Sequence, residues 1–117
     1  MIAVIHVYLD DFRPCPKGFV LAKNVEECLT LLKECEVDIL SLDHDLGWGE
    51  PTGTELVRAM VARGLYGQRI YLHTSSQEGC RRMYEMLYQG KPDTVQLYPH
   101  AMPAVLIGEI AKAANDA

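Results

Sequence analysis

The sequence predicts an α/β domain built on a central, mostly parallel sheet of about five strands. Short apolar runs alternate along the chain with segments of helical period, which is the pattern of strands joined by helices. Loops rich in glycine and proline separate these segments. No repeat, linker or low-complexity tract divides the 117 residues, so we expect residues 1–117 to form a single domain.

The first apolar run, Ile2–Leu9, is the expected first strand, and a short second strand is expected near Phe19–Ala22. Phe12–Gly18 contains two prolines and is predicted to be a loop. The nine residues between the two strands are too few for a helical crossover. A helix is therefore missing here. The second strand either reaches the sheet edge through a short extended loop or is not paired parallel.

Asn24 is expected to cap the first helix, with Glu27 at its N3 position and an end near Glu36. Cys28 and Cys35 are seven residues apart, so on a helix they share one face, and we expect them to be packed inside. The four cysteines show neither a CxxC pair nor the spacing of a zinc site. They are expected to be reduced thiols.

The central strand is expected at Asp38–Leu42, and the glycine-containing loop Leu46–Thr52 follows it. Thr52 or Thr54 is the expected cap of the next helix, which Gly64 ends in a left-handed conformation. The remaining expected elements are a strand over Arg69–Leu72, a helix that Ser75 or Ser76 caps and Gly90 closes, a strand over Thr94–Tyr98, and a helix from Pro103 through Ala113.

Carboxylates directly follow two of the expected strands. Asp10 and Asp11 follow the first strand, and Asp43 and Asp45 follow the central strand. The carboxyl ends of parallel strands meet at one edge of a sheet, where open α/β sheets bind their ligands. Crowded carboxylates raise one another's pKa unless a cation or a proton lies among them. The pattern therefore predicts a site for Mg²⁺ or Mn²⁺ held by these four residues, although strand-terminating solvated aspartates are the simpler alternative.

Two histidines leave the ends of neighbouring strands and are the candidate acid and base beside Asp43. His44 and His73 qualify because imidazole titrates nearest neutral pH. His44 can equally be a turn residue paired with an aspartate. In an extended strand it would point away from Asp43 and Asp45.

Arg13, Thr74 and Ser75 are the candidate substrate-binding residues. The planar guanidinium of Arg13 suits phosphate oxygens, and the amides at the helix start beside Ser75 suit an anion. The alternatives are an ion pair of Arg13 with an aspartate and a simple helix cap at Ser75. Trp48, the only tryptophan, is expected to pack its loop onto the body rather than to stack on a base.

The charge of the chain limits its partners. A net charge of −5 and a pI near 5.3 disfavour duplex DNA, which needs a basic stripe. No run of about 18 apolar residues predicts a membrane span, and the N-terminus lacks a basic leader segment. We expect a cytoplasmic protein whose partner is a small phosphate-containing substrate, and the sequence does not fix its oligomeric state.

The order of these motifs resembles the receiver domain of response regulators. Asp10 and Asp11 match its magnesium-binding acidic pair, Asp43 its phosphoacceptor, and Thr74 or Ser75 its hydroxyl sensor. The resemblance implies a flavodoxin-like, three-layer fold that here lacks its first helix. The receiver lysine expected before a proline after the last strand is replaced by Tyr98, which argues against ordinary phosphorelay signalling.

The fuller pattern is more similar to the cyclic-phosphate-processing receiver-like family. It comprises residues 9–14 (LDDFRP), 41–47 (SLDHDLG), 52–53 (TG) and 73–75 (HTS). The resemblance implies an activity on cyclic phosphates of nucleotides or RNA ends.

Two classes of function stay open. The first is a metal-assisted phosphoesterase that acts on cyclic phosphates. The second is a non-catalytic receiver-like module that signals or binds a partner, with Asp43 at the phosphoacceptor position. A metal-independent two-histidine phosphoesterase is a third, weaker option, because the segment 44–46 lacks the hydroxyl that would match residues 73–75.

Overall fold

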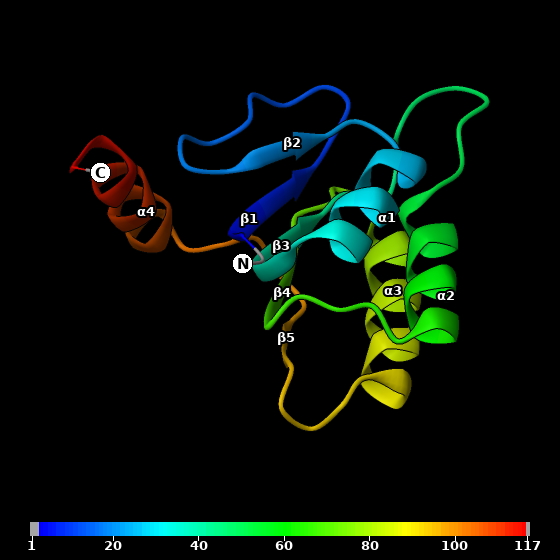
Figure 1. Ribbon diagram of the computed structural model, residues 1–117. Helices are drawn as coiled ribbons and strands as arrows, with labels where there is room; N and C mark the ends of the chain where they lie inside the picture. The colour runs from blue at the N-terminus through cyan, green and yellow to red at the C-terminus, as the bar shows by residue number, and fades with distance from the viewer. Residues whose placement is uncertain (1–2, 117) are drawn as a thin grey trace.

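The computed structural model describes residues 3–116, which form one five-stranded sheet with helices on both faces (Figure 1). All neighbouring strands are parallel, and their order is β2-β1-β3-β4-β5. The predicted α/β class is thereby confirmed. The elements in chain order are β1 (Val4–Leu9), β2 (Val20–Ala22), α1 (Val25–Glu34), β3 (Glu36–Leu42), α2 (Gly53–Arg63), β4 (Arg69–Leu72), α3 (Gln77–Gly90), β5 (Gln96–Tyr98) and α4 (Ala104–Asp116).

The loop between β1 and β2 is too short for a helix, which left open whether β2 pairs parallel with the sheet. β2 pairs parallel with β1 at the edge of the sheet, with Val20 opposite Val7 and Ala22 opposite Leu9. The backbone N–H of Asp10 donates to the carbonyl of Ala22 at 3.0 Å and extends the pairing past the end of β1. The crossover is therefore an irregular loop, and the helix that would normally make it is missing, as predicted.

The helices are divided unequally between the two faces of the sheet. Helices α1, α2 and α3 cover one face, and α4 lies alone on the other, displaced toward the β1–β2 loop (Figure 1). Because α4 has no neighbouring helix, none of its residues is fully buried. Gly18 in the β1–β2 loop has a φ of +91°, and a Cβ there would lie 2.8 Å from Ile110 of α4. Glycine therefore permits both the loop conformation and the approach of α4.

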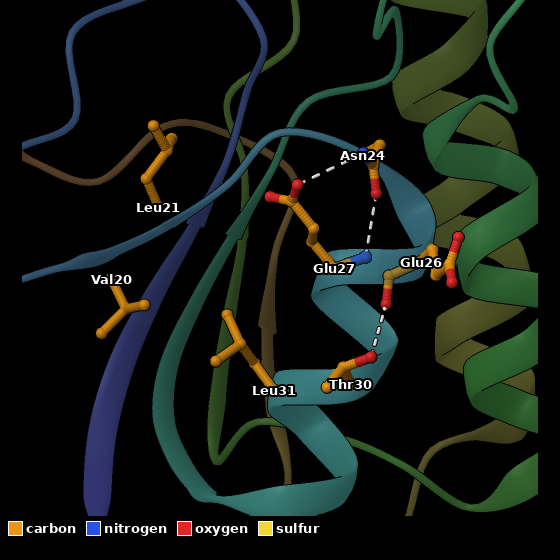
Figure 2. Close-up of a pocket in the computed structure, with 7 residues that line it drawn as sticks. All are labelled: Val20, Leu21, Asn24, Glu26, Glu27, Thr30 and Leu31. Atoms are coloured by element: carbon orange, nitrogen blue, oxygen red, sulfur yellow. Dashed lines mark hydrogen bonds between the residues drawn. The ribbon is translucent and has the colours of Figure 1, made fainter.

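Three polar side chains cap the N-termini of helices and show which of the predicted caps are formed. Asn24, Thr52 and Ser76 each accept a hydrogen bond from a backbone N–H three residues later. Thr54 and Ser75 are thus not the caps. Figure 2 shows the first of these caps, where the side chain of Asn24 faces the N–H of Glu27.

Several predicted boundaries are corrected by strand pairing. Helix α1 ends at Glu34 rather than near Glu36, because Glu36 already pairs with β1 and begins β3. Cys35 is therefore the C-cap and only half-buried, whereas Cys28 is fully buried. Gly90 is the last residue of α3 and not a left-handed stop.

The other boundaries differ less from the predictions. The last strand is shorter than expected, and α4 is longer. Gly64 ends α2 at φ +68°, as predicted. Ile2 lies outside the described residues. No helix within residues 3–116 is both long enough and apolar enough to cross a membrane.

Candidate functional site

Polar side chains from three adjacent strands meet at the carboxyl edge of the sheet. Asp10 follows β1, Asp43 follows β3 and His73 follows β4, and one ligand atom of each lies within 4.8 Å of the others. These are neighbouring strands in the sheet, which explains the convergence of residues that are far apart in sequence. Asp10 and Asp43 are buried, and the side chain of His73 is only 5% exposed.

Arg13 brings a positive charge into this acidic cluster. Its Nη1 lies 2.9 Å from Oδ2 of Asp10 and 3.1 Å from Oδ2 of Asp43. The two carboxylates can approach each other because this guanidinium lies between them. The chain thus supplies part of the positive charge that the clustered aspartates require. It does so from the loop that replaces the missing helix.

The carboxylate of Asp10 has no free acceptor position. Its Oδ1 accepts from the backbone N–H groups of Phe12 and Arg13 at 2.8 and 3.0 Å, and its Oδ2 accepts from Arg13 and His73. Burial alone would raise the pKa of Asp10, but these four hydrogen bonds outweigh it and hold the pKa below its ordinary value. Asp10 therefore organises the cluster, and a metal ion could bind it only by displacing one of these donors.

The imidazole of His73 is fixed through both of its nitrogens. Nε2 lies 2.9 Å from Asp10 Oδ2, and Nδ1 lies 2.6 Å from Oγ of Ser41. The ring of Tyr8 stacks on the imidazole with centroids 4.3 Å apart. Burial lowers the pKa of His73, although the carboxylates of Asp10 and Asp43 oppose that effect.

The neutral form of His73 has one assignment that fits these contacts. A carboxylate only accepts, so Nε2 carries the proton toward Asp10, and Nδ1 accepts the hydroxyl of Ser41. Neither nitrogen is free for a substrate. His73 thus supports Asp10 rather than facing the pocket. Neither Ser41 nor Tyr8 was predicted to contact His73, and Ser41 had been noted only within the pattern of residues 41–47. The available signal was a serine among the buried apolar residues of the second half of the central strand.

His44 and Thr74, two further predicted site residues, do not join the cluster. The His44 ring packs against the first turn of α3, where a Cβ on Gly79 would overlap it. Its backbone N–H donates to Asp43 Oδ1 at 2.8 Å and orients that carboxylate. Thr74 Oγ1 accepts from the N–H of Ser76 at 3.0 Å and closes the turn before α3.

A pocket of about 440 Å³ opens beside the cluster. The buried Asp43 and the partly exposed Arg13 line it, together with the exposed Asp11 and Asp45. Ser75 closes the side formed by the turn before α3. Three carboxylates and one guanidinium give the lining a formal charge of −2. The full lining is Asp11, Phe12, Arg13, Asp43, Asp45, Gly47 and Ser75.

The donor set of this pocket fits a divalent cation. Carboxylate oxygens are the hard ligands that Mg²⁺ and Mn²⁺ prefer, and Mg²⁺ commonly takes one or two of them and keeps several waters. Asp43, with Asp11 or Asp45, provides that number from the open side. The fourth predicted ligand, Asp10, lies behind Arg13 and is already saturated.

A larger hollow of about 520 Å³ lies away from these residues, between β2 and α1 (Figure 2). Its lining combines apolar side chains such as Leu21 and Leu31 with Glu26 and Glu27. Its lining has no positively charged side chain and no histidine, so it is less suited to bind a phosphate ester than the pocket at the carboxyl edge.

The model of the cyclic-phosphate processing receiver domain family matches residues 5–89, which include every residue of the cluster and the pocket. The chain belongs to this family. It is also similar in fold to a CheY-like response regulator receiver domain protein from Methanospirillum hungatei JF-1. The identity is 17%, the TM-score is 0.53, and the match covers 99% of this chain and 96% of the other.

A second solved structure is similar at 18% identity and a TM-score of 0.55, over 96% of this chain and 78% of the other. It is described as yeast Spc42 trimeric coiled-coil amino acids 181–211 fused to another structure. At such identities these likenesses concern the fold alone. No curated protein matches the chain.

The last strand, β5, ends at Tyr98. Tyr98, the residue that the resemblance to receivers puts at the position of their lysine, stacks on Tyr71 with centroids 4.6 Å apart. Its hydroxyl donates to Gln96 at 2.6 Å. The cation that lines the pocket is Arg13, which comes from the opposite side of the site.

Proposed function

We propose that this domain is a phosphoesterase that opens cyclic phosphate esters at the carboxyl edge of its sheet. The observation that carries the proposal is the pocket in which the guanidinium of Arg13 is held against the carboxylate of Asp43. A phosphate ester needs a positive group for its oxygens and a base for the attacking water, and these two side chains supply both. Membership of a family described as cyclic-phosphate processing supports the same chemistry.

Arg13 is proposed to bind the non-bridging oxygens. Its Nη1 is used by Asp10 and Asp43, while Nε and Nη2 have no hydrogen-bond partner among residues 3–116. These nitrogens can donate to two phosphate oxygens in the planar arrangement that guanidinium groups favour. Ser75, at the turn before α3, adds a hydroxyl on the other side of the pocket.

Asp43 is proposed to act as the general base. It accepts a proton from a water molecule whose oxygen forms a new bond to phosphorus. The bond between phosphorus and one ring oxygen then breaks. That oxygen receives the proton back from Asp43, and the product is a phosphate monoester beside a free hydroxyl. His73 and Asp10 are positioning residues in this scheme, because they hold Arg13 in place without facing the pocket.

A divalent cation bound by Asp43 with Asp11 or Asp45 would neutralise charge on the phosphate and on the three pocket carboxylates. We propose that the substrate is a small molecule or an exposed chain end, because the pocket has a volume of about 440 Å³ and the domain is acidic.

The test is release of a phosphate monoester from nucleoside 2′,3′-cyclic phosphates, measured with Mg²⁺, with Mn²⁺ and with a chelator. Asp43→Asn should lower kcat by about 100-fold or more, the usual contribution of a general base. The matched control is Asp93→Asn, an exposed aspartate before β5 at the other end of the sheet, and it should behave as the wild type. Absence of turnover by the wild type with either metal would overturn the proposal.

One observation favours a second candidate, a receiver-like module that takes a phosphoryl group on Asp43. This carboxylate ends the central strand beside a cation, which is the setting of a phosphoacceptor. Incubation with acetyl phosphate or beryllofluoride distinguishes the two. A stable adduct on Asp43 without turnover of cyclic phosphates would favour the module over the enzyme.

A further inference from the structure

Two aromatic side chains are largely exposed to solvent at the carboxyl edge of the sheet. Trp48 is 102% exposed and Phe12 is 82% exposed, more than any other large hydrophobic residue of residues 3–116. Phe12 belongs to the loop after β1, and Trp48 belongs to the loop after β3. The expectation that Trp48 packs its loop onto the body is thus wrong, since the ring has no cover from its own domain.

The backbone of the β3–α2 loop presents Trp48 at the tip of a turn. Gly47 and Gly49 flank it with φ values of +109° and +79°, which side-chain-bearing residues rarely adopt. The N–H of Glu50 donates to the carbonyl of Gly47 at 3.2 Å and closes the turn. Leu46 anchors the start of the loop in the core, where it is 3% exposed. The exposure of the indole therefore follows from a defined backbone conformation.

Both aromatic residues adjoin the pocket beside Arg13 and Asp43. Phe12 lines it directly, and Trp48 follows Gly47, which also lines it. The two loops touch, because a Cβ at Gly47 would lie 3.2 Å from Oδ2 of Asp11. A ligand whose phosphate lies at Arg13 can thus extend past this contact toward exposed aromatic faces.

We propose that Phe12 and Trp48 form a stacking site for the base of a nucleotide whose cyclic phosphate lies in the pocket. The inference rests on the proposed function for the position of the phosphate, and it names the class of substrate as nucleoside rather than sugar or polyol cyclic phosphates. Stacking on aromatic rings binds any base and needs no hydrogen-bond readout. Stacking also gives binding energy that does not depend on charge, at a site where three carboxylates repel an anion.

The single tryptophan of the chain makes the proposal measurable without turnover. Adenosine 2′,3′-cyclic phosphate, added with Mg²⁺ and separately with a chelator, should quench the emission of Trp48 saturably. Ribose 2′,3′-cyclic phosphate, which lacks the base, should bind without quenching. N-acetyltryptophanamide, titrated in parallel, corrects for absorption by the nucleotide.

Variants test the second ring. Phe12→Ala and Phe12→Leu should both weaken nucleotide binding, measured by calorimetry, by about 5- to 150-fold, the range that loss of one stacking partner produces. Neither variant should change the affinity for ribose 2′,3′-cyclic phosphate. The matched control is Tyr88→Ala, which removes an exposed ring near the far end of α3 and should leave both affinities unchanged.

The outcomes separate this inference from the proposed function. Nucleotide binding by calorimetry with unchanged Trp48 emission and unaffected Phe12 variants would overturn the stacking site and leave the phosphoesterase intact. Equal affinity for the nucleotide and for ribose 2′,3′-cyclic phosphate would do the same. Absence of binding by either compound would count against both. A dependence of Trp48 emission on protein concentration alone would show that a second copy covers the ring, and would also overturn the stacking site.

Discussion

Arg13 Nη1 lies 3.1 Å from Asp43 Oδ2 and joins the loop after β1 to the end of β3 beside the pocket. The same nitrogen lies 2.9 Å from Asp10, so a single guanidinium separates two buried carboxylates. An ion that binds Asp43 from the pocket therefore shares this carboxylate with Arg13. The site combines a built-in cation with room for a second one.

Replacing Arg13 should make the protein less stable and more dependent on metal. Arg13→Gln leaves Asp10 and Asp43 facing each other, and because Arg13 is 39% exposed we expect a loss of about 1–3 kcal/mol in unfolding free energy rather than the full cost of breaking a buried pair. Millimolar Mg²⁺ should restore more stability to this variant than to the wild type. Urea unfolding with Mg²⁺ and with a chelator measures both effects.

Arg69→Gln is the matched control for that experiment. Arg69 pairs with Asp38 at 3.0 Å near the other end of the strands, away from the pocket. The Arg69→Gln variant should be less stable than the wild type, and Mg²⁺ should not restore its stability. An equal response in the two variants would contradict a cation site at Asp43.

His73 should make stability fall as the pH drops below neutrality. Its pKa is lowered by burial from an ordinary value of 6.5, so above that value both folded and unfolded states hold a neutral ring and stability is complete. As the pH falls below 6.5, the unfolded state binds a proton that the folded state resists. Stability is then lost progressively until the pH passes the folded pKa.

The measurement is unfolding free energy at about pH 7.5 and about pH 5. His73→Gln should show a smaller loss between the two than the wild type. Burial also lowers the pKa of His6, so His6 should contribute to the loss of stability that remains in His73→Gln. The variant His6→Gln measures this contribution. Asp10 does not interfere, because its stabilisation is lost only below its ordinary pKa of 3.8. An unchanged loss in His73→Gln would show that the ring is protonated in the folded protein.

Cys28 should be the least reactive thiol of the native protein. It is fully buried in α1, and burial raises its pKa to about 12, so the reactive thiolate is scarce at neutral pH. Labelling with a thiol reagent and mass spectrometry should modify Cys28 only when the protein unfolds. The half-buried Cys35 at the helix end is the internal reference. Fast native labelling of Cys28 would contradict the packing of α1.

The sheet, and the aspartates at its carboxyl edge, could be predicted from the sequence because both depend on local pattern. Runs of mainly apolar residues such as 2–9 define strands, and parallel pairing then brings Asp10 and Asp43 to one edge whatever the conformation of the loops. Helix boundaries were less accurate, since pairing of Glu36 with β1 ended α1 earlier than its own residues indicate.

The roles of individual site residues could not be predicted in the same way. The orientation of His44 depends on the packing of α3 against the end of β3, and the partners of His73 come from Ser41, 32 residues earlier, and from Asp10, 63 residues earlier. Such contacts arise only when the sheet is assembled. The exposure of Trp48 depends on the positive φ values of Gly47 and Gly49. The hydrophobicity of the tryptophan itself predicts burial and gives no sign of these backbone conformations.

Gly53 should be required for the fold of the site. It begins α2 against the end of β3, where a Cβ would overlap the carbonyl of Asp43 and lie 2.9 Å from Cα of His44. Because backbone atoms cannot move aside as a side-chain end can, Gly53→Ala should cost about 2–4 kcal/mol in unfolding free energy. It should also move the Asp43 carboxylate and lower turnover of cyclic phosphates. The control is Gly108→Ala in α4, where a Cβ meets nothing within 4 Å and alanine should stabilise the helix by about 0.5–1 kcal/mol. Equal stability of the two variants would contradict the close approach of α2 to β3.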